Sequence, residues 1–341
     1  MRVLYVIPSQ PEDGKFIFAR RQIACMESAG ITTRSFFLTS RTSIPALIAA
    51  FCRLRREIKN FQPDIVHAQF GTMNAMICAC ARTRPLVVTF RGSDINPSCD
   101  ITRLRSCVGR LFSQVAALRA ESIICVTTQL KSRLWWRKSR SKVIPNGVDL
   151  SMFSPIPKAE ARGILGWQVT ERVVLFNAGT AAEAKRLDLA EAAVEKAKLQ
   201  VGAIRFEVLR GKTPPERVPL YLNAADCLLI TSDWEGSPNI LKEALACNLP
   251  VVAVDVGDAA ERLSNVIPSY VVERNPEALG RCVVKVLEGN RRSNGRDRVA
   301  HLSDQAVTEK IRDVYDEVIR EVQDIAAIVS RPYAAGPTQN P

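Results

Sequence analysis

The chain has 341 residues, of which 47% are hydrophobic and 24% are charged. This length suits two globular domains, and this composition excludes a largely disordered chain. The longest uncharged apolar stretches, residues 44–52 and 75–81, are far shorter than the roughly 20 residues of a membrane-spanning helix. The opening MRVLYVIPSQ lacks the long apolar core of a signal peptide, so it predicts a first β-strand. We therefore expect a soluble protein in the cytoplasm.

Cysteine usage argues against a disulfide framework or a zinc site. The sequence has ten cysteines, most of them inside apolar runs, but no CxxC pair and only two histidines. Reduced, buried thiols are the better interpretation.

The net charge of +12 belongs to the first half of the chain, because residues 1–150 contain 23 Lys and Arg against 9 Asp and Glu. Such an asymmetry indicates an anionic partner for that half: nucleic acid, anionic lipid or a phosphorylated substrate.

Short apolar runs alternate with helical patterns throughout the first half. Strands are predicted at residues 3–8, 33–38, 64–70, 86–90, 122–127 and 142–145, with helices between them, for instance at 18–29 and 45–60. This alternation is typical of a parallel sheet with helices on both faces.

The second half repeats the alternation. Strands are predicted at residues 172–179, 204–211, 226–231, 249–256 and 269–273, with helices at 186–198, 238–247 and 276–288. The segment 143–157 is rich in turn residues and separates the two runs. We therefore predict an α/β protein of two doubly wound, Rossmann-like domains, 1–150 and 151–330, which face each other across a cleft. The last helical stretch, 305–330, is expected to cross back to the first domain, and 331–341 to form a disordered tail.

The most informative segment is DWEGSPNILKEALACNLPVVAVDVGDAAE, residues 233–261. Ser237 is predicted to cap a helix with Pro238 as its first residue, which would direct free backbone N–H groups into the cleft as an anion site. Glu235 and Glu243 would repel phosphates, so we expect them to accept hydrogen bonds from sugar hydroxyls.

This segment resembles the E-x7-E signature of the family 4 retaining glycosyltransferases, which have the two-domain GT-B fold. The segments VIPNGVDLSMFSP, PLYLNAADCLLIT, GKFIFARRQIACMESAG and DIVHAQFG resemble other parts of the same family. The resemblance extends to about residue 320. It implies that Glu243 binds the nucleotide ribose, that Glu235 contacts the donor sugar and its phosphates, and that backbone groups of Ser237, Asn239 and Ile240 line the diphosphate pocket.

A second donor site follows the strand that ends at Gly179. In the family, an arginine after the glycine and a lysine before the next helix neutralise the diphosphate. Lys185 occupies the lysine position, whereas Thr180 stands where arginine is usual. Arg186, Arg210 and Lys212 are candidates for the missing charge. For Lys185 we favour this role over that of a solvated surface residue.

Acceptor-side candidates lie in the first domain. Gly14 and Lys15 follow the first strand, where the family has a glycine-rich acceptor loop. His67 ends an apolar strand and is predicted as a core residue rather than an acceptor contact. Arg91, in VTFRGSD, occupies a place where the family often has histidine, so we expect it to meet a phosphate or carboxylate and to take part in catalysis with Glu235 and Lys185. Asp94 suits either a sugar hydroxyl or a turn cap.

Two segments, FCRLRREIKNF and KSRLWWRKSRSK, combine cations with apolar or tryptophan side chains. This pattern suits peripheral binding to an anionic membrane, whereas no nucleic-acid-binding module is present. A solvated basic helix with two buried tryptophans is the alternative.

The sequence therefore predicts a retaining, metal-independent hexosyltransferase that uses a nucleoside-diphosphate sugar, with no cofactor. Its acceptor would be a carbohydrate or a lipid-linked molecule in the assembly of surface polysaccharide, lipopolysaccharide or glycolipid, on the inner face of the membrane. A sugar-nucleotide epimerase on the same fold and a catalytically silent sugar-nucleotide-binding subunit remain as alternatives.

Overall fold

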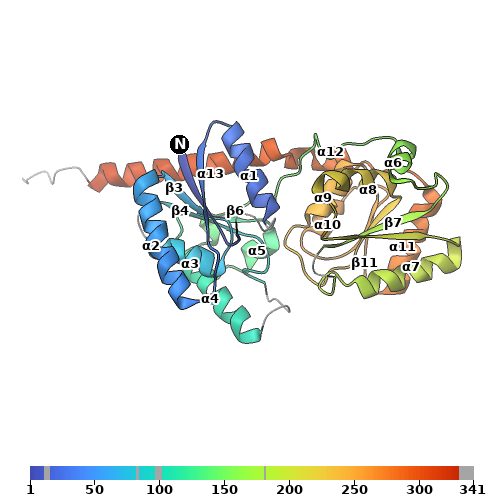
Figure 1. Ribbon diagram of the computed structural model, residues 1–341, viewed down its shortest axis with the longest axis horizontal. Helices are drawn as coiled ribbons and strands as arrows, with labels where there is room; N and C mark the ends of the chain where they lie inside the picture. The colour runs from blue at the N-terminus through green and yellow to red at the C-terminus, as the bar shows by residue number, and fades with distance from the viewer. Residues whose placement is uncertain (11–15, 82–83, 97–101, 180–181, 330–341) are drawn as a thin grey trace, which may run out of the picture.

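A computed structural model describes residues 1–10, 16–81, 84–96, 102–179 and 182–329. The chain forms two parallel sheets, each with helices on both faces, as the alternation of strands and helices predicts (Figure 1). The two-domain α/β fold is confirmed. The eleven predicted strands are present, with ends within two residues of their predicted positions.

The first sheet has the strand order β2-β1-β3-β4-β5-β6, with every neighbouring pair parallel. Its strands are β1 (Arg2–Ile7), β2 (Thr32–Phe37), β3 (Ile65–Ala68), β4 (Leu86–Phe90), β5 (Ser122–Cys125) and β6 (Ser141–Val143). Its helices are α1 (Ile17–Ser28), α2 (Ile44–Phe61), α3 (Thr72–Ala81), α4 (Arg103–Arg119), α5 (Thr128–Ser132) and the 3-10 turn η1 (Lys138–Arg140).

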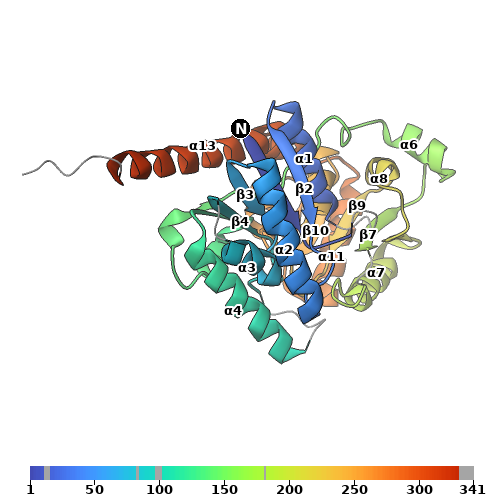
Figure 2. The same cartoon turned by 60° about the vertical axis from the view of Figure 1, so that its left-hand side comes forward.

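Both faces of this sheet are buried because the strands are apolar at successive positions. Leu4 and Val6 of β1 pack with α2, α3 and α4, which Figure 2 shows on the near side of the sheet. Val3 and Tyr5 point to the opposite face, since successive side chains of a strand alternate.

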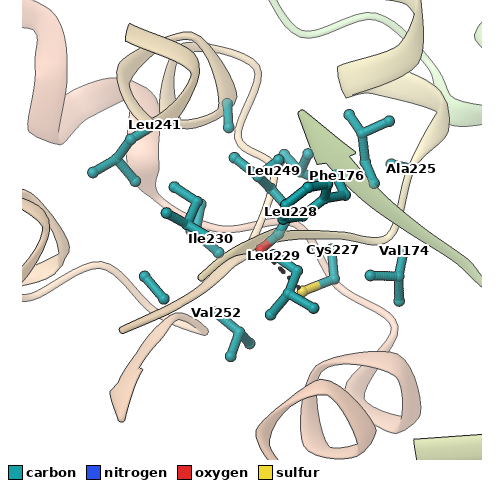
Figure 3. Close-up of a cluster of buried hydrophobic side chains, with 14 of the residues drawn as sticks. Val174, Phe176, Ala225, Cys227, Leu228, Leu229, Ile230, Leu241, Leu249 and Val252 are labelled. Atoms are coloured by element: carbon teal, nitrogen blue, oxygen red, sulfur yellow. Dashed lines mark hydrogen bonds between the residues drawn. The ribbon is translucent and has the colours of Figure 1, made fainter. Parts of the chain in front are cut away.

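The second sheet has the order β11-β10-β9-β7-β8. Its strands are β7 (Val173–Gly179), β8 (Arg205–Arg210), β9 (Cys227–Ile230), β10 (Val251–Val254) and β11 (Tyr270–Val272). The helical segments are α6 (Lys158–Leu165), α7 (Leu187–Val201), η2 (Pro215–Arg217), α8 (Val218–Ala224), α9 (Asn239–Ala246), α10 (Ala259–Leu263), α11 (Pro276–Gly289), α12 (Gly295–Val299) and η3 (Ala300–Leu302). Figure 3 shows the core of this domain, where Leu241 of α9 packs on Leu228 and Ile230 of β9. This packing fixes α9 on a face of the sheet, over its central strand.

A single long helix, α13 (Asp304–Val329), follows the second domain and lies along the first (Figure 1). Its apolar face, including Val307, Ile311 and Val314, packs with α1 and with the second face of the first sheet. The two segments that link the domains lie side by side, since the Val148 N–H donates to Leu302 at 2.9 Å and the Asp304 N–H donates to Val148 at 3.0 Å.

Two expectations about local structure were wrong. Helix α9 begins at Asn239 with Pro238 as its N-cap, one residue later than predicted, and no side chain caps it. Of the cysteines predicted to lie in apolar runs, Cys80 is exposed, because it lies on the outer side of α3. The predicted tail, 331–341, lies outside the described residues.

Candidate functional site

A cleft of about 370 Å³ lies between the two domains and is lined by residues of both. Parallel strands of both sheets end toward it, which is the usual ligand position in open α/β folds. Figure 1 shows α1 and α9 on the sides of the domains that face each other. The lining residues are Phe16, Ile17, Phe18, Arg21, Phe153, Asn177, Leu209, Arg210, Gly211, Thr213, Pro215, Val218, Asn239, Ile240 and Glu243.

Glu243 is the carboxylate that lines this cleft. It projects from the second turn of α9, is half-buried, and has no hydrogen-bond partner among the described residues. Burial raises the pKa of its carboxyl group, while the positive charges of Arg21 and Lys242 act in the opposite direction. A half-buried carboxylate without a protein partner is suited to accept hydrogen bonds from a ligand.

Arg21 of α1 completes this part of the cleft, and the sequence interpretation missed it. The Arg21 guanidinium enters the cleft from the first domain, opposite Glu243 of the second domain. Its central carbon, Cζ, lies 5.9 Å from the centre of the Phe153 ring. The available signal was the two consecutive arginines in FARRQ, close to the helix start after the first strand.

Ser237 does not cap α9 with its side chain, contrary to the prediction. Its hydroxyl is buried, donates to Asp258 at 2.9 Å and accepts from Lys242 Nζ at 2.9 Å. Asp258 also accepts from Arg262 at 2.9 Å. These four residues, which we call the Lys242 network, join the loop before α9 to α9 itself and to the start of α10. Asn239 and Ile240, by contrast, line the cleft as expected.

Lys185 and Glu235, predicted as catalytic residues, form an ion pair with each other. Glu235 also accepts a hydrogen bond from Ser232 at 3.0 Å. Both side chains are more than two-thirds buried. The ion pair therefore balances the two charges beside the loop before α9.

The other donor-side candidates separate into two groups. Arg186 pairs with Asp188 at 2.8 Å and with Asp233 at 3.2 Å, and these acidic partners raise the pKa of its guanidinium. Its charge is thus already neutralised. Arg210 is exposed at the end of β8 and lines the cleft. Gly179 ends β7 with φ +54°, and open space lies where a side chain would be.

Among the described residues, the Arg91 guanidinium bonds to neutral amide and carbonyl oxygens and to no acidic side chain, so its contact with a phosphate or carboxylate stays a prediction. It donates to the carbonyl of Gln69 at 3.1 Å and to the side-chain oxygens of Gln22, Gln69 and Asn146, and it stacks on Phe18 at 4.3 Å. Burial among neutral groups lowers its pKa. The sequence could not show these partners, because the three amide side chains come from separate segments of the chain and meet only in the folded protein.

Arg91 instead helps join the domains. Asn146, which accepts from Arg91, donates to Asn239 at the start of α9 at 3.2 Å. The backbone of Arg91 and Gly92 also packs directly against Gly236, where a side chain on Gly236 would overlap the Arg91 carbonyl. The loop after β4 and the loop before α9 are therefore in contact.

Asp94 and His67 both have structural partners. The buried Asp94 carboxylate accepts from the backbone N–H groups of Gly71, Arg91 and Gly92 at 2.8–3.1 Å, so it acts as the turn cap. His67 is fully buried between Tyr315 at 2.5 Å and Thr89 at 2.7 Å, and burial lowers its pKa well below 6.5. It is a core histidine, as the sequence favoured.

Three positions singled out in the sequence, Gly14, Lys15 and Thr180, lie outside the described residues. Within the described part of the chain, no group of three or more His, Cys, Asp or Glu side chains is arranged to hold a metal ion. None of the helices described there combines the length and apolar character needed to cross a bilayer.

Two family models match the chain. The model "Glycosyltransferase Family 4" matches residues 5–152, and "Glycosyl transferases group 1" matches residues 168–289. Together they cover most of both domains.

Relatives and solved structures agree with these matches. A glycosyltransferase of Bacillus subtilis named for teichuronic acid biosynthesis, TuaC, is 25% identical over 67% of this chain and 62% of its own length. Sucrose-phosphate synthase of Thermosynechococcus elongatus has a TM-score of 0.76 at 18% identity, over 94% of this chain and all of its own. Anabaena HepE, solved with UDP and glucose, has a TM-score of 0.66 at 17% identity, over 96% of this chain and 99% of its own. The matched models cover both sheets and the cleft between them, and so the chain belongs to the family 4 glycosyltransferases of GT-B fold.

Proposed function

We propose that the protein is a retaining hexosyltransferase that takes a sugar from a nucleoside-diphosphate sugar in the second domain and passes it to an acceptor hydroxyl on the first. The observation that carries this proposal is Glu243, a half-buried carboxylate that lines the cleft without a hydrogen-bond partner in the described part of the chain. Ribose hydroxyls would supply the missing donors. HepE, which shares the fold, was solved with UDP and glucose.

The diphosphate leaving group needs positive charge as the glycosidic bond breaks. Arg210 and Arg21 line the cleft, and the start of α9 offers the positive end of a helix. Lys185 would exchange its ion pair with Glu235 for the diphosphate, which would free Glu235 to contact the donor sugar. These cations serve the role that a divalent metal has in other transferases, so we expect transfer to persist in excess EDTA.

The acceptor would be a carbohydrate or lipid-linked molecule of surface polysaccharide, lipopolysaccharide or glycolipid assembly, with the enzyme peripheral on the inner face of the membrane. Exposed Arg55 and Arg56 on α2 and the 56% exposed Trp135 support a membrane-facing first domain. Sedimentation with vesicles tests this point: equal recovery with anionic and neutral lipid would contradict it.

Nucleotide binding tests the donor site without knowledge of the acceptor. UDP, GDP and ADP are titrated calorimetrically into the natural protein and into Glu243→Gln, with Glu288→Gln, an exposed glutamate on α11, as matched control. We expect one nucleotide to bind and Glu243→Gln to weaken this binding at least about tenfold, since a charged hydrogen bond contributes about 1.5–3 kcal/mol. Equal affinity in both variants would refute the ribose role.

Turnover distinguishes the alternatives. Release of nucleoside diphosphate that depends on an added acceptor, with the anomeric configuration kept in the product, supports retaining transfer. Interconversion of the donor sugar without release would identify an epimerase, and binding without turnover would identify a silent subunit.

A further inference from the structure

A second large cavity, of about 380 Å³, lies in the first domain, outside the cleft. We call it the α3–α4 groove; its lining includes Arg41, Thr72, Ser93, Leu104, Arg105 and Val108. Its walls come from the loop after β2, the start of α3, the loop after β4 and the first turns of α4. All of these lie at the carboxyl ends of strands, on the side of the first sheet that faces the second domain.

The groove contains two cations that no acidic group neutralises among the described residues. Arg41 and Arg105 both line it, and neither guanidinium has an ion pair or hydrogen bond there. They are near enough that the charge of Arg105 lowers the pKa of Arg41, in addition to the effect of burial. Two like charges in one cavity favour an anionic occupant. The Thr72 hydroxyl is a third polar group of the wall without a partner among the residues described.

Four further hydroxyl side chains and an apolar strip complete the wall, and part of the apolar strip, which includes Leu104, Val108 and Phe112, is exposed. Leu104 is 77% exposed and Val108 is 40% exposed on α4, while Ile44, at the nearby start of α2, is 71% exposed. A row of exposed aliphatic side chains beside paired arginines fits a molecule that has both an anionic group and an aliphatic chain.

The groove also adjoins the donor side. Ser93 forms part of its wall and directly follows Gly92. A Cβ added to Gly92 would lie 3.2 Å from the backbone nitrogen of Gly236, so the two loops are in close contact. Asp94 and Ser113 fix this arrangement: Asp94 accepts from the Gly71 and Gly92 N–H groups, and Ser113 accepts from the Thr72 N–H at 2.7 Å. A group held in the groove therefore lies beside the loop after β4, which itself contacts the loop before α9.

We propose that the α3–α4 groove binds the phosphate of a lipid-phosphate acceptor through Arg41 and Arg105, with its aliphatic chain along Leu104 and Val108. The assignment of this ligand as the acceptor rests on the proposed transfer reaction. The attached acceptor group would extend past Ser93 toward the cleft.

The test uses dodecyl phosphate below its micelle concentration, titrated into the whole protein without nucleotide. Arg41→Ala and Arg105→Ala are each expected to weaken binding about tenfold. Val108→Asp is expected to weaken it as well, because it places a carboxylate on the apolar wall. Arg103→Ala is the matched control, since this exposed arginine belongs to the same helix but does not line the groove; it should bind as the natural protein does.

Three results would overturn the proposal: unchanged affinity in Arg41→Ala and Arg105→Ala, an equal loss in Arg103→Ala, or equally tight binding of inorganic phosphate. The first would deny the site, the second would indicate diffuse surface charge, and the third would indicate a free phosphate rather than a lipid. Nucleotide affinity of Arg41→Ala should stay unchanged. Failure of donor binding in every variant would refute the proposed function but leave the lipid result intact, so the two failures are distinguishable.

Discussion

The substitution Lys242→Met should stabilise the protein at neutral pH, although it removes a hydrogen-bonded side chain. Lys242 is 1% exposed, and burial lowers its pKa from 10.5 to about 8, with the attraction of Asp258 only partly opposing this. The unfolded chain keeps the lysine protonated up to pH 10.5, whereas the folded protein must hold the charge in its interior. That difference in pKa corresponds to a cost of about 3 kcal/mol below pH 8.

The sign of the pH dependence follows from this difference. Because the folded pKa is the lower one, the cost is fully present below pH 8 and disappears as the pH rises toward 10.5. Methionine has a similar length and no charge, and its loss of the bond to Ser237 costs about 1 kcal/mol. We expect Lys242→Met to be more stable than the natural protein by about 2 kcal/mol at pH 7, and this advantage to be almost lost at pH 9.5.

Urea unfolding of both proteins at pH 7 and pH 9.5 measures the effect. Lys196→Met is the control, since Lys196 is a 47% exposed lysine whose partner is the exposed Glu277; it should change stability by less than about 0.5 kcal/mol at either pH. A stability difference for Lys242→Met that does not vary with pH would refute the reasoning. The variant should also bind nucleotide more weakly, because the loop before α9 loses its attachment to Ser237.

Two further substitutions test the contacts between distant segments. Gly236→Ala would force apart the loop before α9 and the Arg91 carbonyl. We expect at least a tenfold loss of sugar transfer, with an unchanged circular dichroism spectrum. The control Gly289→Ala places its methyl group in open space and should leave transfer unchanged. Normal turnover by Gly236→Ala would show that this contact is dispensable. Tyr315→Phe removes the hydroxyl bonded to His67 at 2.5 Å in the core, and urea titration should show a loss of about 1–3 kcal/mol, with nucleotide affinity unchanged. No loss of stability would mean that His67 finds another partner.

Local sequence patterns were sufficient to predict the strands, helices and fold class. Apolar runs and helical spacing depend on near neighbours in the chain, and two parallel sheets are the arrangement that buries such strands on both faces. The position of Glu243 on α9 also followed from the sequence, because the spacing from Glu235 is local. The N-cap of α9 was misplaced by one residue, since Ser237 has a stronger partner in Asp258, 21 positions further along the chain.

Pairings between distant residues were decided only by the tertiary structure. The neutralisation of Arg186 by Asp233, the amide cage around Arg91 and the contact of His67 with Tyr315 join residues 22 to 248 positions apart. Arg21 became a cleft residue only when α1 was placed opposite α9, and Arg41 and Arg105 became neighbours only when the loop after β2 met α4. The reason is physical: a charged side chain takes the partner that folding brings within a few ångströms, and a single sequence specifies that partner only through the whole fold.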